Sequence, residues 1–134
     1  LMLDLDHFKR VNDEMGHLFG DAVLQQSGAL IRQTVRVTDI AVRYGGEEFL
    51  ILAPETAGTG LEVLAERLRV AFERHEYAYE NASRRVTVSV GGTSIPPYRF
   101  ESMERLVAEA DKALYEAKQT RNAVCVYKPK TESA

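Results

Sequence analysis

Two adjacent carboxylates follow a pair of glycines near the middle of the chain, in the run Gly45-Gly46-Glu47-Glu48-Phe49. The glycines permit positive φ and a close approach of the backbone. The flanking residues, 40–44 and 49–52, are rich in strand-forming types, so the run is predicted to be the tip of a β-hairpin. Acids at such a tip can reach a phosphate group that carries a metal ion.

A second pair of acids lies in the first predicted strand, residues 1–6. Leucines at positions 1, 3 and 5 alternate with Met2, Asp4 and Asp6, so the two aspartates share one face of the strand. One face is therefore predicted to be core and the other to carry charge. Because local burial of unpaired acids is costly, the pattern indicates a cation nearby.

The other periodicities predict the elements that must position these acids. Between the first strand and the hairpin we expect a short helix or turn at about 8–15, a break at Gly16 and Gly20, and a helix with Asp21 as its N-cap. After the hairpin we expect a helix with an apolar stripe from 61 to 72, a strand at 86–90, a helix capped by Ser102 and extending to about 117, and a strand at 123–127. The tail at 129–134 is predicted to be frayed.

The resulting order, β-α-β-β-α-β-α-β, is typical of an α+β fold with a mixed or antiparallel sheet flanked by helices and a ferredoxin-like core. In such a sheet the first strand lies beside the third, which brings Asp4 near Glu47 and Glu48. Clustered carboxylates repel one another unless a proton or cation neutralises them, and hard oxygen ligands favour Mg²⁺. We therefore predict a two-metal phosphoryl-transfer site.

Strand geometry separates the two glutamates of the hairpin. Successive side chains of a regular strand point to opposite faces, so Glu47 and Glu48 cannot be equivalent ligands. The metal is accordingly assigned first to Asp4 and Glu47. The alternative interpretation is that all these acids are solvated charges at strand ends.

Composition bounds the class of protein. With 134 residues, 45% of them hydrophobic, the chain is long enough for one domain, which we place at 1–128. The formal charge of -3 argues against broad binding to nucleic acid. Cys125 is the only cysteine, which excludes an intrachain disulfide, and no apolar run approaches the roughly 18 residues of a membrane span. We expect a cytoplasmic domain that begins at a cut end, Leu1, of a longer protein, whether or not that protein is tethered to a membrane.

Several motifs together resemble the GGDEF-domain family of diguanylate cyclases, and they cover nearly the whole chain. They are the run from Asp4 to Lys9, Asn12-Asp13, Gly16-His17, Gly20-Asp21, the hairpin tip at 45–49, and the segments 86–91 and 110–118. Domains of this family usually open with a helix and a Leu-Thr-Gly-Leu-x-Asn-Arg-like segment. This sequence begins after that segment, so we expect an incomplete domain.

The resemblance implies condensation of two GTP molecules into cyclic di-GMP, with loss of two pyrophosphates, at the interface of two facing domains. It implies a homodimer through these domains and an upstream sensory or regulatory domain. Asp4, the backbone carbonyl of Leu5 and Glu47 would bind two Mg²⁺ (or Mn²⁺) ions. Glu48 would complete the catalytic site beside the attacking 3′-hydroxyl, and whether it acts as base, ligand or both stays open.

Four substrate-binding positions match the family near the first helix. Asn12 and Asp21 match the residues that read guanine, and Phe8 and Lys9 match the loop that receives the terminal phosphates. The ordinary alternatives are a turn residue for Asn12, a helix cap for Asp21 and a solvated charge for Lys9.

Two basic residues near the end of the last helix match those that hold the triphosphate in the family. Here the usual Lys-x-x-Gly-Arg-Asn becomes Lys118-Gln119-Thr120-Arg121-Asn122, which is one residue shorter and lacks the glycine. We therefore expect Arg121 to be displaced. Its alternative role is a favourable charge at a helix C-terminus.

A second, inhibitory site is suggested by Arg36-Val37-Thr38-Asp39, which five residues separate from Gly45 as in the family's product-inhibition motif. Arg67 matches an additional arginine of that site. Arginine stacks on guanine and pairs bidentately with phosphate, so we expect cyclic di-GMP to bind here. The ordinary meaning of such a pair is a surface salt bridge.

Two other classes of protein compete with the enzyme. A catalytically silent receptor for GTP or cyclic di-GMP would fit the shortened segment at 118–121, but degenerate receptors usually lose the acids that this chain keeps. A mononucleotide cyclase or polymerase palm also uses paired acids on a similar sheet. Asn12, Asp21 and the Arg36–Asp39 motif count against that class.

Overall fold

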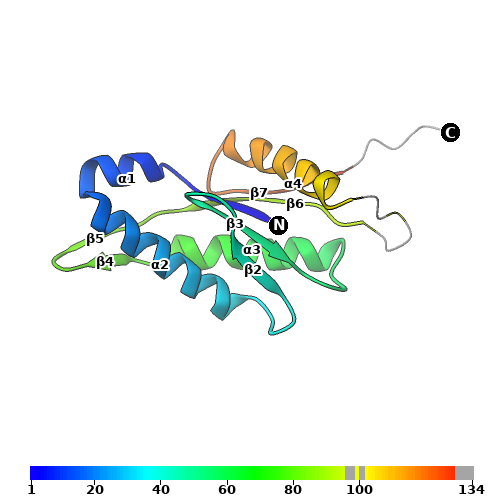
Figure 1. Cartoon of the computed structure of the whole chain (residues 1–134), viewed down its shortest axis with the longest axis horizontal. Coiled ribbons are helices and arrows are strands. Elements are labelled where there is room, and N and C mark those ends of the chain that lie inside the picture. Colours follow the sequence, from blue (N-terminus) through cyan, green and yellow to red (C-terminus); the bar gives the residue numbers. More distant parts are fainter. Residues whose placement is uncertain (96–98, 100–101, 129–134) are drawn as a thin grey trace.

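The computed structural model describes residues 1–95, 99 and 102–128, and the tail predicted to be frayed lies outside this part of the chain. No helix within it is both long and apolar enough to cross a bilayer. In chain order the elements (Figure 1) are β1 (Met2–Leu5), α1 (Phe8–Met15), α2 (His17–Thr34), β2 (Ile40–Arg43), β3 (Glu48–Leu52), α3 (Thr59–Arg74), β4 (Tyr77–Tyr79), β5 (Ala82–Arg84), β6 (Val88–Gly92), α4 (Met103–Lys118) and β7 (Val124–Val126).

Five of these strands form one mixed sheet in the order β2-β3-β1-β6-β7. β1 is antiparallel to β3 and β6, whereas β6 and β7 are parallel. The first strand therefore lies beside the third strand, as predicted, and the register places Asp4 between Glu48 of β3 and Ser89 of β6. The predicted α+β class, with a mixed sheet flanked by helices, is confirmed.

Helices cover both faces of the sheet, and Figure 1 shows α3 and α4 on opposite sides of the strands. The leucines at positions 1, 3 and 5 of the chain pack in one cluster with residues of α2 and α3, among them Val23 and Leu68. On the other face Met2 packs against Ala110 and Leu114 of α4. The face that carries the two aspartates is thus the α4 face. It is not purely charged, because Met2 is completely buried there.

α4 lies directly against β6. A Cβ atom at Gly91 would overlap the backbone of α4 at Leu114, so only glycine allows this close approach. Gly91 belongs to the strand because it pairs with Met2 of β1 and Cys125 of β7, so β6 spans 88–92 rather than the predicted 86–90. α4 begins, as predicted, after Ser102, whose hydroxyl accepts a hydrogen bond from a first-turn amide. The close packing of α4 on Gly91 sets the distance between the carboxyl end of α4 and β1.

The second helix begins earlier than predicted, and the prediction of Asp21 as its N-cap is wrong. α2 starts at His17, and its N-cap is Gly16, with a φ of 89°. Gly20 does not break the chain, because it lies inside the helix where α2 packs against α1. Phe19 is buried and anchors the first turn in the core. Asp21 therefore lies within the helix, with its side chain exposed.

A hairpin of β4 and β5, which the sequence pattern did not indicate, follows α3. Tyr77 is fully buried, and its hydroxyl lies 3.1 Å from the hydroxyl of Ser27 on α2. The side-chain amide of Gln26 donates to the carbonyl of Ala78 at 2.8 Å. Strands of three residues are too short to show the alternation of apolar and polar residues by which a strand is recognised in a sequence. Packing on α2 stabilises this pair of strands.

Candidate active site

The predicted acids meet at the carboxyl end of β1. Asp4 pairs across the sheet with Glu48, the first residue of β3. Glu47 precedes the strand, and its carbonyl accepts a hydrogen bond from the amide of Leu5 at 3.3 Å. Because Glu47 lies outside β3, the alternation of a regular strand does not fix the direction of its side chain. Both glutamate carboxylates interact with the charge of Asp4.

Burial and, to a smaller extent, neighbouring negative charge raise the pKa of both glutamates. Burial, the charge of Asp4 and a hydrogen bond with the Asp4 carboxyl raise the pKa of Glu47. Burial and the charges of Asp4 and Asp111 raise the pKa of Glu48. Lys118 acts in the opposite direction on both pKa values. Three carboxylates, those of Asp4, Glu47 and Glu48, thus lie near the single ammonium of Lys118, which favours a bound cation.

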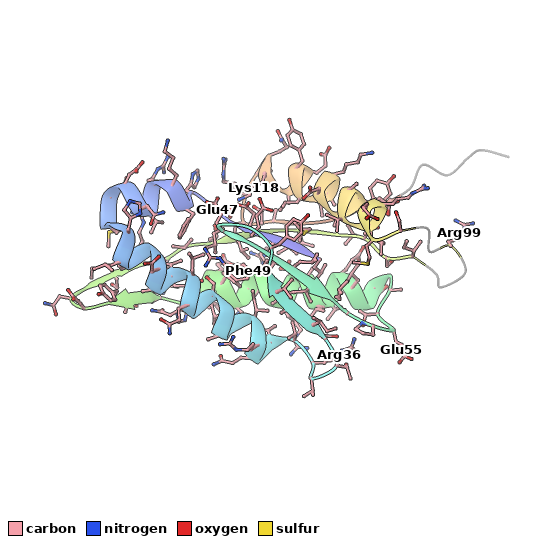
Figure 2. The ribbon with its side chains drawn as sticks, in the orientation of Figure 1. Arg36, Glu47, Phe49, Glu55, Arg99 and Lys118 are labelled. Atoms are coloured by element: carbon pink, nitrogen blue, oxygen red, sulfur yellow. The ribbon has the colours of Figure 1, made fainter. Side chains whose placement is uncertain are left out.

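Lys118 is the cation that the chain itself supplies to these acids. Its ammonium nitrogen lies 2.8 Å from Asp4 Oδ1 and 2.9 Å from Asp6 Oδ1. It also donates to the backbone carbonyls of Asp4 and Leu5, each at 3.2 Å. Figure 2 shows Glu47 and Lys118 at the same edge of the molecule. A positive charge is therefore already accommodated by the Asp4 carboxylate and the Leu5 carbonyl.

These donors fit a Mg²⁺ or Mn²⁺ ion. They are a carboxylate, a backbone carbonyl and the nearby Glu47 carboxylate, all of them hard oxygen ligands. Within the described residues, no group of three or more histidine, cysteine, aspartate or glutamate side chains is arranged to hold a metal by itself. Mg²⁺ usually completes its coordination with water and substrate phosphates.

Asp4 and Glu47 open onto a polar hollow of about 610 Å³, whereas Glu48 is not among the residues that line it. Seven of the predicted site residues line it: Asp4, Leu5, Phe8, Lys9, Glu47, Lys118 and Arg121. Four further residues, which are not among the predicted site residues, also line it: His7, Arg10, Asp13 and Glu14. His7 and Asp13 belong to the motifs Asp4 to Lys9 and Asn12-Asp13, whereas Arg10 and Glu14 carry no such signal in the sequence. The hollow therefore combines carboxylates on β1 and the hairpin with cations from α1 and α4.

The amino end of α1 contributes to this hollow. The first amides of a helix have no intrahelical partner, and they carry the positive end of the helix dipole, which suits a phosphate group. Phe8 contributes only through its backbone, because its ring is buried in the core. Lys9 and Arg10 are exposed and bring two positive charges to the same place.

The turn between α4 and β7 keeps Arg121 in the hollow. Arg121 and Asn122 have φ angles of 59° and 45°, a left-handed conformation in which glycine is favoured. The turn is nevertheless formed without a glycine, and the amide of Asn122 donates to Asp6 Oδ2 at 2.8 Å. The expected displacement of Arg121 does not remove it from the site, because its side chain lines the hollow.

Asn12 and Asp21 do not line this hollow. The Asn12 amide packs on Gly20, where a Cβ atom would overlap its oxygen. Asp21 follows Gly20 directly on α2. The packing of α1 on α2 thus brings the two predicted guanine-reading residues to the same helix junction, and their role stays a prediction.

The predicted inhibitory motif forms a closed turn before β2. The Asp39 side chain is fully buried, whereas that of Arg36 is 54% exposed. Asp39 accepts hydrogen bonds from the backbone amide of Arg36 at 2.9 Å and from its guanidinium at 3.2 Å. The same guanidinium donates to the carbonyl of Pro54 and the hydroxyl of Thr56. Arg36 lies at the end of β2 opposite to the hairpin tip that carries Glu47 (Figure 2).

Arg67 does not join Arg36 and Asp39. It lines a surface hollow between α2 and α3, together with Thr34 and Arg74, and neither residue of the Arg36–Asp39 pair belongs to that lining. The three residues predicted for the inhibitory site are therefore divided between two places.

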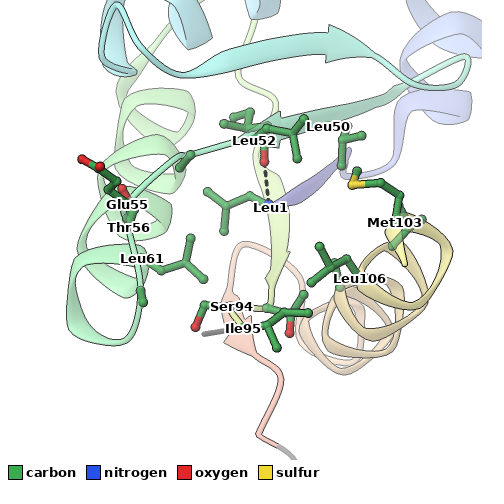
Figure 3. A pocket seen from close by; sticks show the side chains of 16 residues that line it. Leu1, Leu50, Leu52, Glu55, Thr56, Leu61, Ser94, Ile95, Met103 and Leu106 are labelled. Atoms are coloured by element: carbon green, nitrogen blue, oxygen red, sulfur yellow. Dashed lines mark hydrogen bonds between the residues drawn. The ribbon is translucent and has the colours of Figure 1, made fainter. Parts of the chain in front are cut away.

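A further hollow of about 560 Å³ lies between β3, α3 and α4 (Figure 3) and is mostly apolar. Leu1, Leu50 and Leu106 are among the residues that line it. The backbone nitrogen of Leu1 donates to the carbonyl of Ile51 at 2.8 Å. None of the predicted site residues lines this hollow, so the candidate chemistry belongs to the polar one.

Comparison with known proteins agrees with this geometry. The family described as "Diguanylate cyclase, GGDEF domain" matches residues 1–123. Diguanylate cyclase A of Treponema denticola is 42% identical over 131 residues, which is 96% of this chain and 34% of that protein. The chain thus spans about a third of the length of this curated relative.

Solved structures show the same fold. The active GGEEF domain of a diguanylate cyclase from Vibrio cholerae has a TM-score of 0.86 and 31% identity, covering 96% of this chain and 81% of that one. The GGDEF domain of DgcB from Caulobacter crescentus, in complex with c-di-GMP, has a TM-score of 0.87 and 34% identity, covering 94% of this chain and 75% of that one. The similarity in sequence and in structure therefore extends over nearly all of this chain.

Proposed function

Because the chain belongs to the GGDEF-domain family of diguanylate cyclases, we propose that it condenses two molecules of GTP into cyclic di-GMP and releases two pyrophosphates. One observation carries this proposal. Two acids, Asp4 and Glu47, share a single hollow with three cationic side chains, those of Lys9, Lys118 and Arg121. Phosphoryl transfer needs this combination, because acids hold the metal ion while cations hold the phosphates.

The reaction consists of two equivalent steps. In each step a 3′-hydroxyl oxygen attacks the α-phosphorus of the other GTP, a new phosphodiester bond forms, and the bond to pyrophosphate breaks. Asp4, the carbonyl of Leu5 and Glu47 would hold Mg²⁺ or Mn²⁺. When bound, such an ion supplies positive charge at the α-phosphate and lowers the pKa of the attacking hydroxyl.

The triphosphate would lie along the cationic side of the hollow. The amides of the first turn of α1 and the ammonium of Lys9 would receive the terminal phosphates. Lys118 and Arg121 would contact the triphosphate from the end of α4. Asn12 and Asp21 would read guanine at the junction of α1 and α2.

Glu48 would act next to the attacking hydroxyl. It is registered opposite Asp4, and its raised pKa makes its carboxylate a better proton acceptor than an ordinary glutamate. This favours the role of general base, in addition to any contact with the metal ion.

The active arrangement would need two copies of the domain. One chain supplies one polar hollow for one GTP, whereas the product joins two nucleotides, so two domains must face each other in a homodimer. A sensory or regulatory domain elsewhere in the complete protein would control this encounter in the cytoplasm. Cyclic di-GMP would inhibit the enzyme by binding the exposed guanidinium of Arg36, which Asp39 holds in place, whereas Arg67 lines a separate hollow.

The test is to incubate the complete protein with GTP and Mg²⁺, after removing any bound product, and to separate the products by chromatography. We expect one cyclic di-GMP and two pyrophosphates for every two GTP consumed. A Glu48→Gln variant serves as the inactive control. If the complete protein binds GTP or cyclic di-GMP but makes no product at high protein concentration, the proposed activity is wrong and a receptor role is favoured.

A further inference from the structure

Asp6 is a buried carboxylate to which the proposed mechanism gives no role. It follows β1 directly, and its side chain is 1% exposed. Oδ1 accepts hydrogen bonds from Lys118 at 2.9 Å and from the hydroxyl of Ser89 at 2.7 Å. Oδ2 accepts from the hydroxyl of Thr87 at 2.7 Å and from the amide of Asn122 at 2.8 Å. Four hydrogen bonds hold this buried carboxylate in one position and orientation.

Two of these four contacts reach the cationic side of the hollow. Lys118 is the last residue of α4, and Asn122 lies in the turn that carries Arg121. Both partners are more than a hundred residues away from Asp6 in the sequence. The other two, Thr87 and Ser89, lie at β6 and tie the carboxylate to the sheet. Asp6 therefore connects the sheet to the segment that carries both proposed triphosphate contacts.

The turn at Arg121 depends on such a contact. Two consecutive residues, Arg121 and Asn122, have positive φ, which costs free energy for side chains other than glycine. The hydrogen bond from the Asn122 amide to Asp6 compensates for part of this cost. Without it, a different conformation of the turn becomes more favourable, and Arg121 leaves its place.

We propose that Asp6 is a positioning residue, which holds Lys118 and Arg121 in place for the triphosphate of GTP. This inference rests on the proposed function. A carboxylate is needed because the ammonium of Lys118 and the amide of Asn122 can only donate, and each faces a different oxygen. An asparagine at position 6 would turn its NH₂ group against one of these two donors. Its similar size would leave the surrounding core filled.

The experiment compares Asp6→Asn with Thr87→Val in the complete protein. Thr87→Val removes one hydrogen bond to the same carboxylate but leaves Lys118 and Asn122 bound. The affinity of each variant for GTP is measured by calorimetry, with Ca²⁺ in place of Mg²⁺ so that no catalysis occurs. The thermal unfolding of each variant is measured as well. We expect GTP affinity to fall on the order of tenfold in Asp6→Asn and to change less than twofold in Thr87→Val. Amide exchange of residues 119–123 should accelerate in Asp6→Asn only.

The outcomes separate this inference from the proposed function. If the unaltered protein binds no GTP, the proposed function fails, whereas the exchange measurement still tests the contact between Asp6 and the turn. If Asp6→Asn loses thermal stability yet binds GTP as the unaltered protein does, Asp6 serves the fold alone and the inference is wrong. The same holds if both variants lose affinity equally. Should Asp6→Asn not fold, Asp6→Glu, which keeps the charge and moves it by one methylene, provides the comparison.

Discussion

The ammonium of Lys118 lies 2.8 Å from the carboxylate of Asp4 and also donates to the carbonyl of Leu5. These two oxygens belong to the group of donors that would hold the metal ion. A lysine and a divalent cation compete for these oxygens because both are positively charged and repel each other. Binding of the ion would therefore weaken the contact between Lys118 and Asp4, while the ammonium keeps its contact with Asp6 beside the hollow.

Replacing Lys118 should change metal and nucleotide affinity in opposite directions. In a Lys118→Met variant, Asp4 and Leu5 lose their competing cation, so Mn²⁺ affinity without nucleotide should rise severalfold, on the order of one charge contact. GTP affinity should fall, because a triphosphate contact is missing. Titration with Mn²⁺ followed by electron paramagnetic resonance measures the first effect. Lys112→Met, an exposed change on the same helix, is the control, and weaker Mn²⁺ binding in Lys118→Met would contradict the competition.

Burial of Glu47 and the nearby charge of Asp4 should reduce stability at neutral pH. A pKa raised in the folded state means that the folded protein binds the proton more tightly than the unfolded chain does. The contribution of Glu47 to stability is thus present below its ordinary pKa of 4.5 and is lost as the pH rises through its higher folded value. Glu47→Gln should therefore stabilise the fold at pH 7 by a few tenths of a kcal/mol, since solvent screens a partly exposed carboxylate.

Thermal unfolding between pH 4 and pH 7.5 measures this effect. The difference between Glu47→Gln and the unaltered protein should grow as the pH rises. Glu80→Gln, in an exposed turn between β4 and β5, serves as the matched control. A Glu47→Gln variant that is less stable at neutral pH than at pH 4, relative to the unaltered protein, would show that the repulsion is absent.

Gly20 should control guanine recognition through Asn12. In a Gly20→Ala variant, the new methyl group overlaps the Asn12 amide oxygen, which is the end of a side chain and can move away. We expect the preference for GTP over ATP in binding assays to fall about tenfold, the effect of one lost polar contact to the base, while the fold is kept. Gly28→Ala, on the same helix, should leave this preference unchanged. An unaltered preference in Gly20→Ala would argue against the role of Asn12.

Replacing Arg36 should weaken inhibition by the product. Arg36→Ala removes the exposed guanidinium but leaves the backbone amide that binds Asp39. Inhibition of the complete protein by added cyclic di-GMP should be relieved by at least about tenfold, as expected when an arginine contact to a phosphate or guanine is lost. The Arg32→Ala variant, which is changed in the last turn of α2, should be inhibited by cyclic di-GMP as strongly as the unaltered protein. Inhibition that persists in Arg36→Ala would exclude this site.

Gly91 should be indispensable for the packing of α4. In Gly91→Ala the new methyl group overlaps the backbone at Leu114, so α4 must move, at a cost of about 1 to 3 kcal/mol in the free energy of unfolding. Gly28→Ala has no such neighbour and should stabilise α2 by roughly 0.5 to 1 kcal/mol. Urea unfolding measures both effects. Equal stability of the two variants would show that the contact with α4 is loose.

Local patterns in the sequence determined the fold class and the place of the acids. Alternation in residues 1–6 identified the face that Asp4 and Asp6 share, and the double glycine before Glu47 identified the hairpin. These features are local, because side-chain periodicity and turn chemistry depend on neighbouring residues only. The α+β order then brought the first strand beside the third, and the structure confirms this pairing.

Only the tertiary structure decided how the remaining groups meet. The start of α2 at His17 depends on the packing of Phe19. The position of Arg121 depends on the hydrogen bond between Asp6 and Asn122, which lie 116 positions apart in the sequence. Asp6 and Asp4 look alike in the sequence, yet one is enclosed by four donors and the other opens onto the hollow. No local period encodes such contacts, because they arise when α4 packs on β6 and closes over the end of β1.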